Sequence, residues 1–176
     1  AASSGMRNGS SGGGLLSVVN ADGTNLRSLG VTASDADWSP AGDRAVLTTF
    51  SYESESPVGD LSLIGADGSG LEPLGLQGYC PRWSPDGSRV AFVFWRSTGA
   101  TIAVAQLGAA RSVTSLTEIP VHAHGLAWSP DSTKLVFASS GASPGLFIIT
   151  ADGTGAPQPL GVAGEWVPWQ GAPGPS

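Results

Sequence analysis

The stretch Trp83-Ser84-Pro85-Asp86-Gly87 decides the fold, because close copies of it recur along the chain. The copies begin at Trp38, Trp83 and Trp128, which lie 45 residues apart, and a lone Trp169 follows 41 residues after the third. Proline fixes φ at its position and a glycine at the end accepts a positive φ, so the stretch has the chemistry of a tight turn. A fixed period of about 40 to 45 residues is typical of propeller blades.

A second landmark, Ala-Asp-Gly followed by Thr or Ser, repeats in step with the first. Its copies are Ala21-Asp22-Gly23-Thr24, Ala66-Asp67-Gly68-Ser69 and Ala151-Asp152-Gly153-Thr154, with a degenerate copy at residues 106–110. Strand-like runs flank each copy, so we interpret it as the connection of a β-hairpin. The aspartates of both landmarks are interpreted as structural, because Asp side chains hydrogen-bond the backbone of their own turn. A bound Ca²⁺ is the alternative.

The residues between the turns predict four strands in each repeat. In the repeat that begins at Trp83, the runs cover 89–95, 101–105 and 112–116, and a fourth run approaches Trp128. Apolar residues show no helical spacing, Gly and Pro number 26 and 13, and only 12% of the residues are charged. We therefore predict an all-β fold, a β-propeller of four four-stranded antiparallel blades.

These motifs resemble the WD40-like repeat of the TolB-like propeller family. The similarity is carried by residues 83–92, where the turn precedes an apolar strand, and by residues 17–29, where Asn-Ala-Asp-Gly precedes two spaced leucines. It extends over essentially the whole chain. The resemblance implies a bacterial, extracytoplasmic protein, periplasmic or secreted, that binds peptide segments of other proteins.

We predict one propeller domain over residues 1–170, followed by a Pro/Gly tail at 171–176. The four blades are expected at 1–30 together with 165–169, at 34–75, at 79–117 and at 122–161. The C-terminal strand at 165–169 would close the first blade, because a closed ring removes unpaired strand edges. One alternative is half of an eight-bladed homodimer, in which two chains exchange this strand. The other is an arc of a longer propeller.

Composition excludes several classes of partner. The net charge of −6 argues against nucleic acid, because phosphates require a basic surface. The longest apolar runs, residues 90–95 and 146–149, are far too short to span a bilayer, so no membrane insertion is expected. The single Cys80 cannot form an internal disulfide, and we interpret it as a small buried residue.

Propeller loops lie on two faces, and sorting the charges between those faces predicts that one is acidic. The loops that lead into each Trp-bearing strand, and those that join the second and third strands, carry a net charge of −4, against −1 on the other face. We predict that this acidic face, at the mouth of the central channel, binds a protein, peptide or cation. A solvated rim that keeps the protein soluble is the alternative. The predicted binding residues are Asp35, Glu53, Glu55, Tyr79, His122, His124, Glu165 and Trp166.

His122-x-His124 is the sharpest local feature. Residues i and i+2 of a strand point to the same side, so both imidazoles could bind one metal, with Glu165 or Asp35 adding a carboxylate. We expect no cofactor other than a divalent cation at this place. The resemblance adds that some TolB-like propellers are metal-dependent polysaccharide lyases with histidines in their sites. The alternative is that the two histidines only line a loop.

No complete catalytic set is visible in the sequence, so we predict that the protein is not an enzyme. Gly141-Ala142-Ser143-Pro144-Gly145 matches Gly-x-Ser-x-Gly, but it joins two strands, whereas the hydrolase motif requires a strand-to-helix elbow. Ser143 is therefore rejected as a nucleophile. The tryptophans in register with the repeat, interpreted as packing between blades, are Trp38, Trp83, Trp128 and Trp169. Trp95 and Trp166 fall outside the repeat and are candidate ligand contacts, with core packing as the alternative.

Three functional hypotheses follow. The first is a non-enzymatic interaction scaffold that uses the acidic channel mouth. The second is a carbohydrate-active protein, either a lectin or a metal-dependent lyase. The third is a structural module that assembles with copies of itself. All three are compatible with the fold, because propellers carry many functions.

Overall fold

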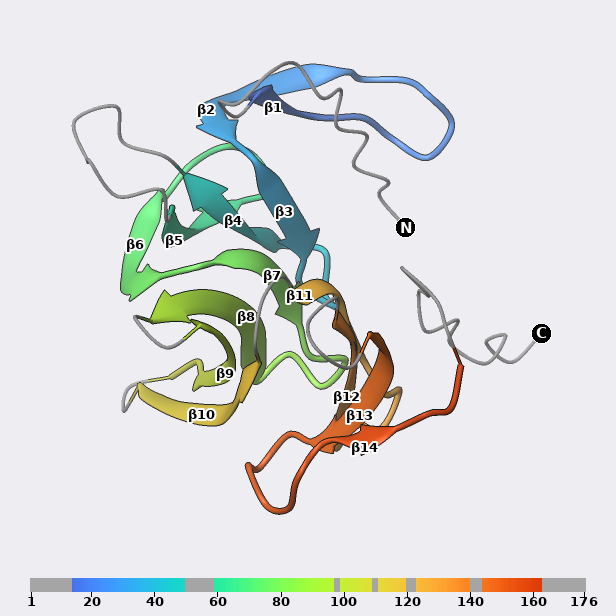
Figure 1. Ribbon diagram of the computed structural model, residues 1–176. Coiled ribbons are helices and arrows are strands. Elements are labelled where there is room, and N and C mark those ends of the chain that lie inside the picture. The colour runs from blue at the N-terminus through green and yellow to red at the C-terminus, as the bar shows by residue number, and fades with distance from the viewer. Residues whose placement is uncertain are drawn as a thin grey trace. The chain divides into compact units, whose positions relative to one another are not determined.

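The computed structural model of the chain consists of β-strands joined by turns and loops (Figure 1). It describes residues 14–49, 59–96, 99–108, 111–119, 123–139 and 144–162. Within these residues there is no helix, and hence none that could cross a membrane. The strands are β1 (Gly14–Val18), β2 (Arg27–Ala33), β3 (Asp35–Trp38), β4 (Arg44–Thr49), β5 (Asp60–Gly65), β6 (Glu72–Gln77), β7 (Tyr79–Trp83), β8 (Arg89–Arg96), β9 (Gly99–Gln106), β10 (Ser112–Ile119), β11 (Ala123–Trp128), β12 (Lys134–Ser139), β13 (Gly145–Thr150) and β14 (Gln158–Pro159). The all-β prediction is confirmed.

The strands form four sheets, one for each predicted blade. Blade 2 (β3–β6), blade 3 (β7–β10) and blade 4 (β11–β14) are four-stranded, and strands that follow one another in sequence are neighbours in the sheet. Blade 1 contains the antiparallel pair β1 and β2. The rest of the predicted blade 1, in residues 1–13 and 165–169, lies outside the described residues. Closure of blade 1 by the C-terminal strand therefore stays a prediction.

The Trp-Ser-Pro turn connects the first two strands of blades 2, 3 and 4 in the same way. In each copy the serine N–H donates to the carbonyl of the first residue of the next strand at 2.9 Å. The residue three places after the serine is Gly42, Gly87 or Ser132, and its φ is 70°, 75° or 59°. The turn requires a left-handed residue here, which explains why two of the three copies have glycine.

The second strand of each complete blade is deeply buried. Val46 and Leu47 in β4, Val90 and Val93 in β8, and Leu135 in β12 have 0% of their surface exposed. These strands have neighbours on both edges and apolar side chains on both faces, which is why they are near-continuous apolar runs in the sequence. The core therefore lies in the middle of each blade.

The chain divides into two units, residues 1–81 and 82–176, which we describe separately. In the first unit, β2 of blade 1 also contacts the turn between β5 and β6 of blade 2. The Arg27 side chain donates to the carbonyl of Ala66 in that turn. A Cβ on Gly68, whose φ is 86°, would lie 3.4 Å from the backbone of Leu29. The apolar cluster that joins the two blades contains Leu16, Leu29, Ala33, Ala45, Leu47 and Ile64.

In the second unit, Trp128 joins blade 4 to blade 3. Its indole Nε1 donates to the carbonyl of Arg82 at 2.9 Å, and the guanidinium carbon of Arg89 lies 5.0 Å from the ring centroid. Arg89 also donates to the carbonyl of Ser132 at 2.5 Å. The backbone N–H of Asp86 donates to the hydroxyl of Ser132 at 3.0 Å. The prediction that the repeated tryptophans pack between blades is confirmed for Trp128.

Two substitutions at Ser132 separate the contribution of its hydroxyl to the free energy of unfolding from the cost of its left-handed backbone. Ser132→Ala removes the acceptor of the Asp86 N–H and keeps a side chain at positive φ, so we expect it to lower the free energy of unfolding by about 1–3 kcal/mol. Ser132→Gly removes the same acceptor but relieves the left-handed backbone, which is worth about 1 kcal/mol, so it should be the milder change. Urea unfolding followed by tryptophan fluorescence measures both. Equal losses in the two variants would contradict the strain at this residue.

Candidate interaction face

One end of blade 2 carries carboxylates at the points where its strands begin. Asp35 opens β3 and Asp60 opens β5, and they pair in the sheet with Thr48 and Thr49 at the end of β4. The hydroxyl of Thr49 donates to the carbonyl of Asp60 at 3.2 Å. Asp60 is exposed and Asp35 is half-buried. We call this the acidic end of blade 2.

The backbone brings Tyr79 to the same end. The N–H of Gly78 donates to the carbonyl of Gly59 at 2.8 Å, so the residue before Tyr79 is bonded to the residue before Asp60. Tyr79 opens β7 and is half-buried. Among the described residues of blade 2, the one basic side chain is Arg44, which opens β4 at the opposite end of the sheet. The acidic end therefore carries two carboxylates, which lie on opposite faces of the sheet because Thr48 and Thr49 alternate, and the backbone of Tyr79 reaches the same end.

At the opposite end of the blades, the turn aspartates are bound by their own turns. The carboxylate of Asp67 accepts the backbone N–H of Ser69 at 2.9 Å and its hydroxyl at 2.6 Å. Asp131 accepts the hydroxyl of Ser129 at 2.5 Å and the backbone N–H of Thr133 at 3.0 Å. The same pattern recurs at Asp22, Asp86 and Asp152. The interpretation of the turn aspartates as structural is confirmed.

These hydrogen bonds lower the pKa values of the turn carboxylates. Hydrogen bonds from Ser129 and Thr133 lower the pKa of Asp131 to about 2. Burial raises the pKa of Asp86, but the hydrogen bonds from Ser84 and Ser88 outweigh it and lower that pKa to about 2. The pKa is also lowered, chiefly by hydrogen bonds from neighbouring Ser or Thr residues, at Asp22, Asp43, Asp67 and Asp152. Carboxylates bound in this way have a structural role.

Cys80, next to Tyr79, is half-buried and has a φ of 52°. The interpretation of Cys80 as a small buried residue is therefore wrong, because its side chain is partly exposed. Gly125 occupies the equivalent place three residues before Trp128, has a φ of 69°, and coincides with a shift in the register of β11 against β12. The first strands of blades 3 and 4, β7 and β11, thus both contain a residue with positive φ. Of the two residues, only Gly125 indicated this conformation in the sequence.

The other predicted site residues are only partly covered by the structure. His124 lies in β11, where its backbone pairs with Ala138. The predicted residues that lie outside the described part of the chain are Glu53, Glu55, His122, Glu165 and Trp166. Within the described residues, no three His, Cys, Asp or Glu side chains are grouped closely enough to hold a metal ion. The metal site at His122 and His124 stays a prediction.

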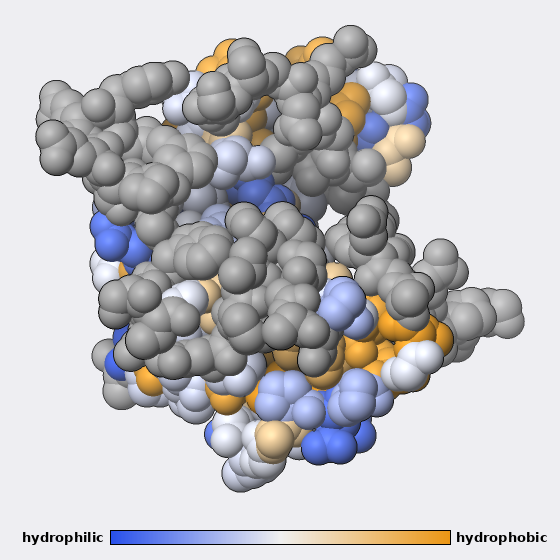
Figure 2. All heavy atoms as spheres, in the orientation of Figure 1, coloured by the Kyte–Doolittle hydropathy of each residue, from blue (hydrophilic) through white to orange (hydrophobic). Residues whose placement is uncertain are grey.

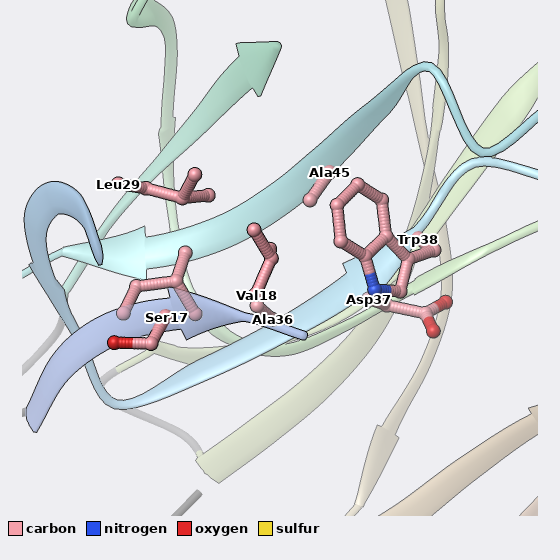
Figure 3. A pocket seen from close by; sticks show the side chains of 8 residues that line it. Ser17, Val18, Leu29, Ala36, Asp37, Trp38 and Ala45 are labelled. Carbon is pink, nitrogen blue, oxygen red and sulfur yellow. The ribbon is translucent and has the colours of Figure 1, made fainter. Parts of the chain in front are cut away.

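Sequence reasoning did not find an apolar groove in the first unit (Figure 3). Its walls come from blade 1 and from the first two strands of blade 2, and Trp38 and Val18 border it. The lining residues are Leu16, Ser17, Val18, Leu29, Ala36, Asp37, Trp38 and Ala45.

The second unit also exposes apolar surface. Figure 2 shows apolar residues gathered where β12, β13 and β14 lie in Figure 1. Leu160 and Val162, which follow β14, are 43% and 53% exposed. Isolated apolar residues are common on protein surfaces, so this patch alone does not identify a site.

Comparison with known proteins establishes the fold. Neither a protein-family model nor a curated protein matches the sequence. TolB from Acinetobacter baumannii superimposes on 86% of this chain with a TM-score of 0.68 and 22% sequence identity. The fold is that of the TolB-like β-propellers. A structure of a nidogen/laminin complex matches 89% of the chain, with a TM-score of 0.67 and 13% identity. Oligogalacturonate lyase in complex with manganese matches 83%, with a TM-score of 0.63 and 18% identity.

These likenesses concern a part of each larger protein. This chain spans 38% of the TolB chain, 61% of the chain in the nidogen/laminin complex and 41% of the lyase chain. At such identities the similarity shows the fold, and the predicted TolB-like architecture is confirmed. Because a lyase shares this fold, the architecture alone does not decide whether the chain is an enzyme.

The turn carboxylates predict a loss of stability in acid. The pKa of Asp131 is about 2 in the folded protein and about 3.8 without its hydrogen bonds, so its stabilising contribution is fully present above pH 4. That contribution is lost as the pH falls from about 4 towards 2, where the folded carboxylate is protonated. We expect the urea midpoint to fall across this window.

Asp131→Asn tests this assignment, because asparagine keeps an acceptor for the Thr133 N–H but does not titrate. The midpoint of this variant should fall less between pH 4 and 2 than that of the parent protein. Asp60→Asn makes the same charge change outside a turn and serves as the control. A parental pH dependence in Asp131→Asn would contradict the role of this carboxylate.

Proposed function

We propose that the chain is a non-enzymatic interaction scaffold whose acidic end of blade 2 binds a basic segment of a protein partner. The observation that carries the proposal is that Asp35 and Asp60 lie at one end of the sheet, opposite Thr48 and Thr49 of β4, while Arg44 lies at the other end. Each carboxylate can accept hydrogen bonds from Lys or Arg, and the ring of Tyr79, next to Gly78 at this end, can contact the aliphatic part of such side chains.

The proposed binding face includes two further acidic residues, because the segment that contains them joins two strands at this end of blade 2. Glu53 and Glu55 lie between Thr49, at the end of β4, and Asp60, at the start of β5. Both ends of this segment are attached to the acidic end of blade 2. The local charge would then reach −4 with no compensating base between residues 45 and 77, which would attract a cationic partner at long range.

The kind of partner is supported by the comparisons and by the resemblance to TolB-like proteins. One of the structural matches is a chain from a nidogen/laminin complex. In that assembly, a chain with this fold is part of a complex between two proteins. The TolB match supports an extracytoplasmic place for the chain, periplasmic or secreted. We therefore propose a protein or peptide partner outside the cytoplasm. A cation at the same carboxylates is the smaller ligand that this chemistry allows.

A metal-dependent lyase is the enzymatic alternative, favoured by one structural match, the manganese complex of oligogalacturonate lyase. In this chain it would depend on His122 and His124. Metal analysis of the purified protein separates the two proposals: one bound manganese or other transition ion per chain, lost in His122→Ala, would favour the lyase.

The scaffold proposal predicts that carboxylate removal weakens binding at one end only. A fluorescent peptide of alternating Lys and Ser serves as the probe, and its dissociation constant is measured by anisotropy at low and physiological salt. We expect Asp35→Asn with Asp60→Asn to weaken binding about five- to thirtyfold, since each of the two contacts is worth roughly 0.5–1 kcal/mol in a solvated site. The difference should shrink as salt is raised.

The matched control is Asp22→Asn with Asp67→Asn, which removes the same charge from the turns and keeps an acceptor oxygen in each. This double variant should bind the peptide like the parent protein. Equal weakening by both double variants would mean that only net charge matters, and the proposed face would be wrong.

A further inference from the structure

The outer strand of blade 3, β10, differs from the outer strands of blades 2 and 4. β6 contains Pro73 and a glycine, Gly75, with a φ of 68°, and β14 has two residues, of which Pro159 is one. Proline and short length prevent an edge strand from pairing with another chain, and a left-handed glycine departs from strand geometry. β10 has eight residues, with neither proline nor glycine among them. The outer edge of blade 3 therefore lacks all of these features.

The first part of β10 is exposed and uncharged. Val113 is 46% exposed, and its neighbours Ser112 and Thr114 are exposed as well. The segment 112–117, Ser-Val-Thr-Ser-Leu-Thr, carries no charge and is rich in β-branched residues. Such a segment has a strong tendency to pair as a β-strand. Within the described residues β10 pairs with β9 alone, so about half of its backbone N–H and C=O groups point away from β9.

The neighbouring blade contacts a face of β10. A Cβ on Gly153, in the turn after β13, would lie 3.1 Å from the Cγ2 of Thr114 and 3.7 Å from the Cδ2 of Leu116. Both atoms belong to side chains, which stand roughly perpendicular to a sheet, whereas the backbone groups of an edge lie in its plane. Figure 1 shows β10 as the outermost strand of its sheet. The contact with blade 4 thus leaves the edge itself to another strand.

The register of β10 makes this strand complementary in charge to a second copy of itself. Against β9, the register shifts by one residue at Leu116. With that residue left out of the count, Arg111 lies three positions before Thr114 and Glu118 lies three positions after it. An antiparallel pair of β10 strands centred on Thr114 therefore places the arginine position of each copy opposite the glutamate position of the other. Opposite charges in such cross-strand positions stabilise a strand pair.

We propose that the outer edge of β10 pairs with β10 of a second copy of this chain, antiparallel about a two-fold axis at Thr114. The occupant is a second copy because the charges that flank the strand match each other in this register. Two four-stranded blades would join into one continuous sheet, and no strand would leave its blade, unlike in a ring formed by strand exchange. The interface is small, so we expect a dissociation constant in the micromolar range. This proposal does not depend on the proposed function of the acidic end.

Sedimentation equilibrium of the intact chain is the first test. We expect the average mass to rise from one chain towards two as the concentration passes through the micromolar range. Arg111→Glu should raise the dissociation constant about tenfold, because it places two like charges opposite one another at both ends of the strand pair. Lys134→Glu makes the same charge change at the exposed start of β12 and should leave the dissociation constant unchanged. The mass of one chain at every concentration would overturn the proposal.

A charge exchange tests the register. Glu118→Arg alone should weaken the dimer as Arg111→Glu does, and the two substitutions together should restore it. If the combined variant dimerises no better than the single variants, the proposed pairing is wrong. Urea unfolding of each variant checks that the blades are intact. If Arg111→Glu does not fold, Val113→Lys replaces it, since a lysine on an exposed edge opposes pairing, and an unchanged dissociation constant in that variant would also contradict the proposal.

Hydrogen exchange locates the surface. The backbone amides of β10 should exchange more slowly at concentrations where the dimer forms, whereas those of β6, the outer strand of blade 2, should exchange at the same rate. A dimer whose formation leaves the exchange of β10 unchanged would use another surface, and the assignment to this edge would be wrong.

Discussion

The structure depends on one contact between blades 3 and 4: the buried indole N–H of Trp128 in blade 4 donates to the carbonyl of Arg82 in blade 3. A buried donor without an acceptor would cost about 1–3 kcal/mol. Arg89 lies over the same ring and donates to the carbonyl of Ser132, so this contact helps to hold its neighbours in place. In a repeat array of this kind, each unit is stabilised by its contacts with the next.

The carboxylates that stabilise turns and the carboxylates that are available to bind a partner lie at opposite ends of blade 2. At the turn end, Asp67 accepts two hydrogen bonds and Asp131 three from their own turns, and their charge is part of the fold. At the other end of blade 2, Asp60 is exposed, and its backbone rather than its side chain holds the sheet together. Binding at that end can therefore change without loss of the turns, which is how a scaffold can diversify on a constant fold.

Local chemistry explains what the sequence predicted well. The Ser-Pro-Asp-Gly turns and the apolar runs of β4, β8 and β12 are specified by residues close in sequence, so the blades could be predicted from them. Ser132 could not be predicted at a position where the other turns have glycine. The hydrogen bonds that offset its left-handed backbone come from Asp86 and Arg89, which belong to another blade. Asp35 and Tyr79 were predicted on one face, but the hydrogen bond from Gly78 to Gly59, which brings Tyr79 to the end of blade 2 where Asp60 lies, joins residues distant in sequence. The groove beside Trp38 left no sequence signal for the same reason.

The size of the ring and the proposed binding site are separate questions. This chain spans between 38% and 61% of the three proteins with which it shares the fold, and the number of blades decides which strand completes blade 1. The carboxylates of the acidic end belong to β3 and β5 of a single blade, and their spacing is fixed by the hydrogen bonds of that sheet. The two carboxylates therefore keep their places whatever the number of blades in the array. The acidic end is a property of blade 2, because one sheet alone sets the positions of Asp35 and Asp60.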